Sequence, residues 1–111
     1  MNLNDEPKVW NRRSLRVPPG AIYVARPSKF GNPFSHRASK IPGIILVPSR
    51  DDAIRRFQEW VMAPEQAELR EAARKELRGK DLVCWCAPQF CHADIWLEIA
   101  NEQGSLHALD R

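Results

Sequence analysis

Blocks of hydrophobic residues along the chain, separated by polar and proline-rich stretches, predict several short strands. Compact runs rich in apolar and β-favouring residues are typical of buried parallel strands. Four segments fit this description: 8–11, 21–25, 44–47 as a short edge strand, and 81–86 as a central strand. Within 81–86, alternation places Leu82, Cys84 and Cys86 on one face and Val83 and Trp85 on the other.

Three other segments have the apolar spacing of amphipathic helices. The first begins after Ser49, because Ser49-Arg50-Asp51-Asp52 has the Ser-x-x-acid form of a helix cap. Pro64 suits the first turn of a second helix, which Gly79 ends. A third begins at Cys91 or His92 and ends at Gly104. Strands separated by helices predict an α/β fold, a small Rossmann-like and mostly parallel sheet flanked by about three helices.

The 111 residues fit one domain. We expect a flexible tail at 1–7, a single α/β domain at 8–104 and a C-terminal tail at 105–111. The polar N-terminus does not resemble a signal peptide, and no apolar run approaches the roughly 20 residues that span a bilayer. These features predict a cytoplasmic protein without a membrane partner.

Basic residues are concentrated in the first part of the chain. The net charge is +3, but residues 1–40 contain eight basic and two acidic side chains, and the rest contains nine basic and twelve acidic ones. A basic region can attract the phosphate of a nucleotide or nucleic acid. Its alternative role is to keep the surface soluble.

Segments of unusual composition follow three predicted strands: 11–13, 26–34 and 86–92. Ligands of open parallel sheets bind beyond the carboxyl ends of the strands, so these segments are expected to form one site. Arginine and lysine there can hold phosphate, glycine allows close backbone approach, and an amide can read a sugar or base. The predicted ligand-binding residues are Arg12, Arg26, Ser28, Lys29, Gly31 and Asn32. Alternatively, 26–34 is a structural turn in which Asn32 caps the backbone and Phe30 and Phe34 fill the core.

The sequence Cys84-x-Cys86-x4-Cys91-His92 allows three interpretations. It can be a zinc site with Cys84, Cys86, Cys91 and His92 as ligands, or with His36 or His107 in the fourth position. It can hold a nucleophilic Cys91 at a helix N-terminus with His92 or His36 as proton carrier. It can also be a set of small buried residues without chemistry. The spacing leaves all three open, with Cys91 and His92 as the catalytic candidates.

The remaining notable side chains favour structural roles. Trp10, Trp60, Trp85 and Trp96 are expected in the core, and stacking on a base is an alternative only for Trp10, beside the basic segment 11–13. Asp94 and Glu98 lie one turn apart on the last helix and fit a solvated face better than an acid pair.

Three motifs resemble a phage and bacterial family known as domain of unknown function 4326. They are residues 22–34 (Ile-Tyr-Val-Ala-Arg-Pro-Ser-Lys-Phe-Gly-Asn-Pro-Phe), residues 77–88 (Leu-Arg-Gly-Lys-Asp-Leu-Val-Cys-Trp-Cys-Ala-Pro) and residues 91–94 (Cys-His-Ala-Asp). One departure is Ala25, where the family pattern has glycine. The resemblance implies that one site contains Arg26, Lys29, Asn32, Cys84, Cys86, Cys91 and His92. It implies no activity.

The leading hypothesis is a phage-type or bacterial accessory protein that binds a nucleotide or nucleic-acid phosphate at the strand ends. In one version of this hypothesis, the protein is a hydrolase or transferase that acts on that ligand with zinc as cofactor. The alternative is a non-catalytic module, stabilised by zinc or by packed thiols, that binds DNA, RNA or a host protein. Neither the reaction nor the oligomeric state follows from the sequence.

Overall fold

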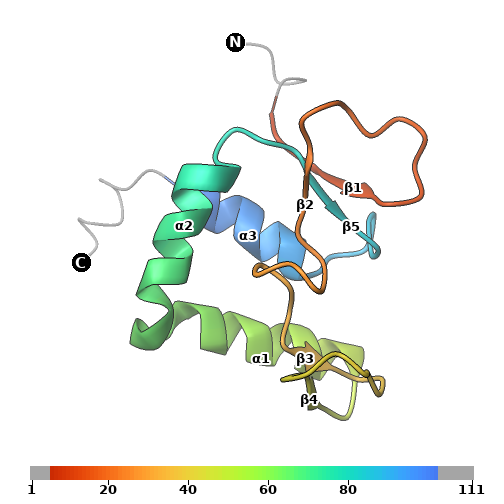
Figure 1. The fold of residues 1–111 in the computed structure, drawn as a ribbon, viewed down its shortest axis with the longest axis vertical. Helices are drawn as coiled ribbons and strands as arrows, with labels where there is room; N and C mark the ends of the chain where they lie inside the picture. The colour runs from red at the N-terminus through yellow and green to blue at the C-terminus, as the bar shows by residue number, and fades with distance from the viewer. Residues whose placement is uncertain (1–5, 103–111) are drawn as a thin grey trace.

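The computed structural model describes residues 6–102, which form a parallel three-stranded sheet with helices packed against it (Figure 1). The strand order is β1 (Val9–Asn11), β5 (Leu82–Cys84) and β2 (Ile22–Tyr23). Both outer strands pair in parallel with β5, whose three residues are all buried. Leu82 and Cys84 belong to the main core and Val83 lies outside it, as the predicted alternation requires.

A second, two-stranded parallel sheet is formed by β3 (Phe34–Ser35) and β4 (Ile45–Leu46). It packs through β3 against helix α1 (Arg50–Met62), as Figure 1 shows. Phe34 and Ser35 are buried, whereas β4 is exposed. This small sheet holds the segment after residue 33 close to the start of α1.

Local sequence signals mark the starts of the helices and the end of the second one. The Ser49 Oγ accepts a hydrogen bond from the Asp52 backbone N–H and caps α1. A short 3-10 helix, η2 (Pro64–Gln66), leads into α2 (Ala67–Leu77), and Gly79 follows with a φ of +75°. The last helix, α3 (His92–Asn101), is capped by Cys91. In the described residues it ends at Asn101, before the predicted stop at Gly104.

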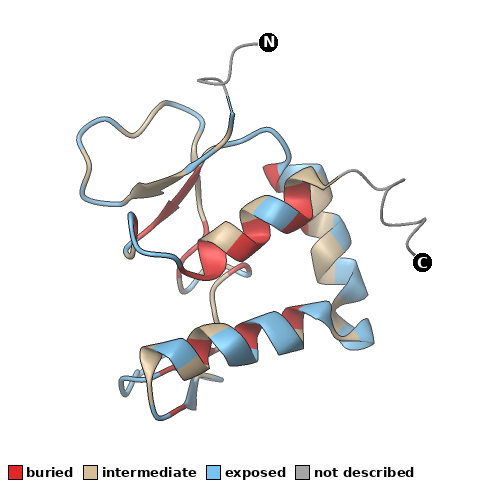
Figure 2. Cartoon of the chain, turned by 180° about the vertical axis from the view of Figure 1, so that it is seen from behind, coloured by how far each residue is buried: buried red, intermediate tan, exposed pale blue. Residues whose placement is uncertain are grey.

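The core lies between α3, α1, α2 and the sheet. Figure 2 shows α3 buried along much of its length, whereas α1 is buried only along one stripe. Trp96 of α3 is fully buried, and its ring meets Phe30 and Phe57 edge-on. The Trp96 Nε1–H donates to the Phe30 carbonyl at 2.7 Å. This residue therefore joins α3, α1 and the loop after β2.

The predicted α/β class, three helices and parallel strands are confirmed. The strands are shorter than expected and form two small sheets, and the Rossmann-like arrangement stays a prediction. The core position of Trp85 was wrong: it follows β5 and is 50% exposed. Its indole N–H donates to the Tyr23 hydroxyl instead of facing the core.

Most of the two predicted tails lies outside the described residues, as do Gly104 and His107. In the described part, no helix has both the length and the apolar character needed to cross a membrane.

Candidate functional site

The site lies at the carboxyl end of β5, which the neighbouring strands hold in place. The Asn11 amide, at the end of β1, donates to the carbonyls of Trp85 and Ala87 at 3.0 and 2.8 Å. These bonds fix the connection between β5 and α3. They also give Asn11 a structural role that its position beside two arginines did not suggest.

Three cysteines meet at this end of the strand. The sulfurs of Cys84, Cys86 and Cys91 all lie within 4.8 Å of one another, and those of Cys84 and Cys91 are 3.4 Å apart. None forms a disulfide. Cys84 and Cys91 are each 2% exposed, and Cys86 is half-buried. The local sequence thus brings together three soft ligands that could hold a metal ion.

The start of α3 fixes the position of Cys91. Its Sγ accepts from the Ala93 backbone N–H at 3.4 Å, and its own N–H donates to the Asp94 carboxylate at 2.9 Å. This is a capping box in which a thiol takes the place of the usual hydroxyl. Asp94 therefore serves the helix terminus and is not part of an acid pair with Glu98.

The three thiols differ in pKa. Hydrogen bonds from Cys84 and Cys91, together with the nearby Arg50 guanidinium, hold the pKa of Cys86 far below its usual range. Hydrogen bonding to Cys84 and Cys86, and burial, raise the pKa of Cys91. Cys86 is therefore the thiol that ionises first, whereas Cys91 was the nucleophile predicted from the sequence.

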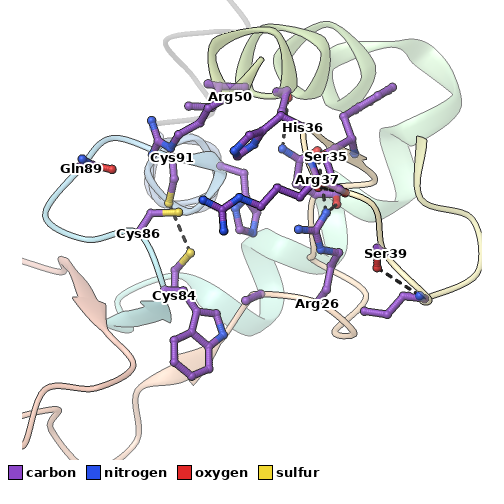
Figure 3. Close-up of a pocket in the computed structure, with 18 of the residues that line it drawn as sticks. Arg26, Ser35, His36, Arg37, Ser39, Arg50, Cys84, Cys86, Gln89 and Cys91 are labelled. Carbon is purple, nitrogen blue, oxygen red and sulfur yellow. Dashed lines mark hydrogen bonds between the residues drawn. The ribbon is translucent and has the colours of Figure 1, made fainter. Parts of the chain in front are cut away.

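A pocket of about 660 Å³ opens beside the sulfurs. Its lining includes all three cysteines and, from the rest of the chain, Arg26, His36, Arg37 and Arg50. Figure 3 shows Arg26 and Arg37 across the pocket from the sulfur atoms, and Arg50 beside Cys91. Among residues 6–102, no carboxylate lines the pocket. The pocket therefore combines a thiol cluster with an electropositive wall.

Arg26 and Asn32 line this pocket, but part of their bonding capacity is used within the fold. The Arg26 Nη1 donates to the carbonyls of Asn32 and Phe34 at 3.0 and 3.5 Å. The Asn32 Oδ1 accepts from the Phe34 N–H, and its Nδ2 donates to the Ala53 carbonyl. With Phe30 and Phe34 buried, Asn32 has the capping role of the structural alternative.

The other predicted ligand-binding residues do not line the pocket. Lys29 forms an ion pair with Glu76 at 2.6 Å on the exposed surface. The Ser28 hydroxyl accepts from the Phe30 backbone N–H, which tightens the turn. Arg12 is exposed, and its backbone N–H extends the sheet by donating to the Cys84 carbonyl.

His92 lies outside the group of metal-ligating atoms that the cysteines form. Its Nε2 lies 2.9 Å from the Val24 carbonyl; because a carbonyl only accepts, Nε2 carries the proton. The ring packs edge-on against Phe57, and burial lowers the pKa of His92 below its usual value. His36 is exposed on the pocket wall, and His107 lies outside the described residues.

Sequence reasoning missed Arg37 and Arg50 as site residues. Arg50 is the first residue of α1 and was attributed to the helix cap, although its guanidinium reaches across to the Phe90 carbonyl. Arg37 follows β3, a strand that the sequence did not predict. The basic excess over residues 1–40 was the only signal that included Arg37.

Gly31 lies outside the pocket lining and packs closely against Arg26. A Cβ at this position would lie 2.9 Å from the Arg26 Cγ and 3.0 Å from the Arg26 Cα and N. We therefore expect Gly31→Ala to lower the free energy of unfolding by about 1–3 kcal/mol, measured by urea denaturation. A double variant that also carries Arg26→Ala should stay destabilised, because the backbone atoms of residue 26 remain. Full rescue in that double variant would contradict this explanation.

Comparison with known proteins gives a family but no described activity. No curated protein and no solved structure matches the chain. The family model described as "Domain of unknown function (DUF4326)" matches residues 8–102, which include every element of the fold and the whole pocket. The resemblance seen in the motifs is thereby confirmed, and the chain belongs to the DUF4326 family.

Proposed function

We propose that this protein binds a phosphate-bearing ligand, a nucleotide or a phosphate of a nucleic acid, in the pocket beside the cysteine cluster. The observation that carries the proposal is the pocket lining, to which the described part of the chain contributes Arg26, Arg37 and Arg50 but no carboxylate. Arginine forks onto phosphate oxygens, and the affinity of such pairs rises where neighbouring groups exclude water.

The size and charge of the pocket suit a mononucleotide. Its volume of about 660 Å³ lies within the usual range of small-molecule sites. Arg37 has no ion pair with a described residue, so its charge is available to a ligand. Arg26 is half-buried, and its bonds to two carbonyls fix its direction. A preordered guanidinium loses less entropy when an anion binds.

We propose zinc as the metal of the cysteine cluster. A Zn–S bond of about 2.3 Å with tetrahedral angles separates two sulfur ligands by about 3.8 Å. The sulfurs of Cys84 and Cys91 are 3.4 Å apart and all three sulfurs lie within 4.8 Å of one another, so small side-chain movements are enough. Thiolate ligands favour zinc over the hard cations calcium and magnesium.

The pocket arginines are the direct test of ligand binding. We expect Arg37→Ala and Arg50→Ala each to weaken the affinity for AMP or pyrophosphate about tenfold or more, because each removes a charge-assisted hydrogen bond. Isothermal titration calorimetry at fixed ionic strength measures the change. Arg16→Ala is the matched control, since Arg16 is exposed and outside the pocket lining. Equal losses in all three variants would contradict a specific pocket.

Turnover is tested separately from binding. Incubation with nucleotides, NAD and single-stranded DNA, followed by mass spectrometry, would reveal a hydrolase or transferase. Product that forms with the parent protein and disappears in Cys86→Ser would assign the chemistry to the cluster.

The second candidate function is a non-catalytic nucleic-acid-binding module. It is favoured by the exposed loop between β1 and β2, which carries Arg12, Arg13 and Arg16. Steep salt dependence of the affinity for single-stranded DNA, lost in Arg12→Ala and Arg16→Ala but kept in Arg37→Ala, would favour it.

A further inference from the structure

The cysteine cluster provides three metal ligands, and the described residues add no fourth. A structural zinc site is closed by four protein ligands, whereas a site that binds an exchangeable ligand has three. Neither ring nitrogen of His92, the predicted fourth ligand, belongs to this group of ligand atoms; its Nε2 bonds to the Val24 carbonyl and its ring packs on Phe57. The remaining described residues contribute no donor to the group formed by Cys84, Cys86 and Cys91.

The direction of the fourth position follows from burial. Cys84 and Cys91 are each 2% exposed and pack in the main core, which closes the cluster on that side. All three cysteines also line the pocket, and Cys86 is half-buried at its edge. An ion bound to the three sulfurs therefore has its remaining tetrahedral position on the side of the pocket.

The charges favour an anionic donor at that position. A zinc ion with three thiolates carries one net negative charge, which by itself would repel an anion. The pocket supplies three guanidinium groups, because Arg26, Arg37 and Arg50 line it together with the three cysteines. The combined site is therefore positive.

We propose that the zinc has an open fourth coordination position facing the arginine pocket, and that a phosphate oxygen of the bound ligand occupies it, with water there otherwise. This inference rests on the proposed function, because the arginines then hold the same phosphate group. It makes the metal centre and the arginine pocket two halves of one binding site.

Cobalt substitution of the 111-residue chain tests the open position. Co²⁺ takes the place of zinc and reports its ligands through thiolate charge-transfer and ligand-field absorption bands. Adding pyrophosphate, or azide as a small anion, should shift the ligand-field bands while the thiolate bands persist. In Arg37→Ala, the pyrophosphate concentration needed for half of this shift should rise about tenfold or more. Bands that neither anion changes would overturn the proposal.

Histidine variants test for a closed site. His36→Ala, His92→Gln and His107→Ala should each leave the Co²⁺ spectrum of the ligand-free protein unchanged. A changed spectrum in one of them would identify that histidine as a fourth ligand and overturn the open position. Circular dichroism of His92→Gln checks that this buried variant is folded. If it is not, the anion titration of the parent protein still tests whether the fourth coordination position is open.

The two proposals fail in different ways. If calorimetry detects pyrophosphate binding but the ligand-field bands do not move, the arginine pocket is a binding site and the open metal position is wrong. If azide shifts the bands but neither pyrophosphate nor AMP binds, the metal position is open and the phosphate ligand is wrong. If Co²⁺ produces no thiolate bands, the cysteines do not hold this metal and the further inference is wrong.

Discussion

Replacing Trp96 with alanine is expected to lower the free energy of unfolding by about 3–5 kcal/mol, a large part of the stability of a small domain. The indole is fully buried, and its ring centroid lies 5.1 Å from that of Phe30 and 5.7 Å from that of Phe57. Its loss leaves a cavity and removes the hydrogen-bond donor of the Phe30 carbonyl. Urea denaturation followed by circular dichroism measures the change.

Two matched variants separate the causes of this effect. Trp96→Phe keeps an aromatic ring but loses the N–H, so it should fall between the parent and Trp96→Ala, at about 1–3 kcal/mol. Trp85→Ala, at a half-exposed tryptophan, should cost much less. A Trp96→Ala variant as stable as Trp85→Ala would contradict the central position of Trp96 in the core.

The same residue connects stability with the site. Trp96 lies on α3, whose N-cap is Cys91, and it bonds to the loop that contains Arg26. Loosening this contact should therefore move the cysteine cluster relative to the arginines. We infer that the pocket depends on the packing of α3 as much as on its own side chains.

The helices were predictable because their signals are local. The Ser49 cap, the proline at position 64 and the glycine at position 79 each act within one turn of a helix end. The first segment with the apolar spacing of an amphipathic helix became α1, which buries Ala53, Phe57 and Val61. Such features are determined by a few neighbouring residues, so they can be predicted from the local sequence.

The strands were less predictable because they are short and depend on distant partners. Phe34 and Ser35 form a strand only through pairing with Ile45 and Leu46, and no local pattern marks a two-residue strand. Trp85 continues the alternation of β5 in the sequence, but the strand ends at Cys84. Its indole then bonds to Tyr23, a contact between residues far apart in the chain.

The candidate site also has one part that local sequence predicts and another that depends on tertiary packing. The three cysteines lie within eight residues, so a strand and a tight connection were enough to predict that they meet. The arginine wall depends on Arg37 and Arg50, which only tertiary packing brings to the cysteines. Lys29 was predicted as a phosphate ligand, but its partner is Glu76, an acid that no sequence motif connects to it.

Protein purified without chelator is expected to contain about one zinc per chain by plasma mass spectrometry, and Cys91→Ser should lose it. Zinc at about a thousand times its dissociation constant would add about 4 kcal/mol to stability. Since each kcal/mol moves the melting temperature of a domain this size by about 4–8 °C, chelation should lower it by well over 10 °C. Differential scanning calorimetry with and without chelator measures this shift.

His36→Ala is the control for this prediction, because His36 lines the pocket outside the cysteine group and should keep the metal. Metal-free protein with an unchanged melting temperature in chelator would contradict the zinc site.

In that case, the alkylation rates of the thiols would distinguish a reactive centre from cysteines that only pack in the core. A reactive centre should show fast alkylation at Cys86, which is half-buried with a lowered pKa, and slow alkylation at the buried Cys91. Slow alkylation at both would leave the cysteines as packing residues, and the arginines alone would account for ligand binding.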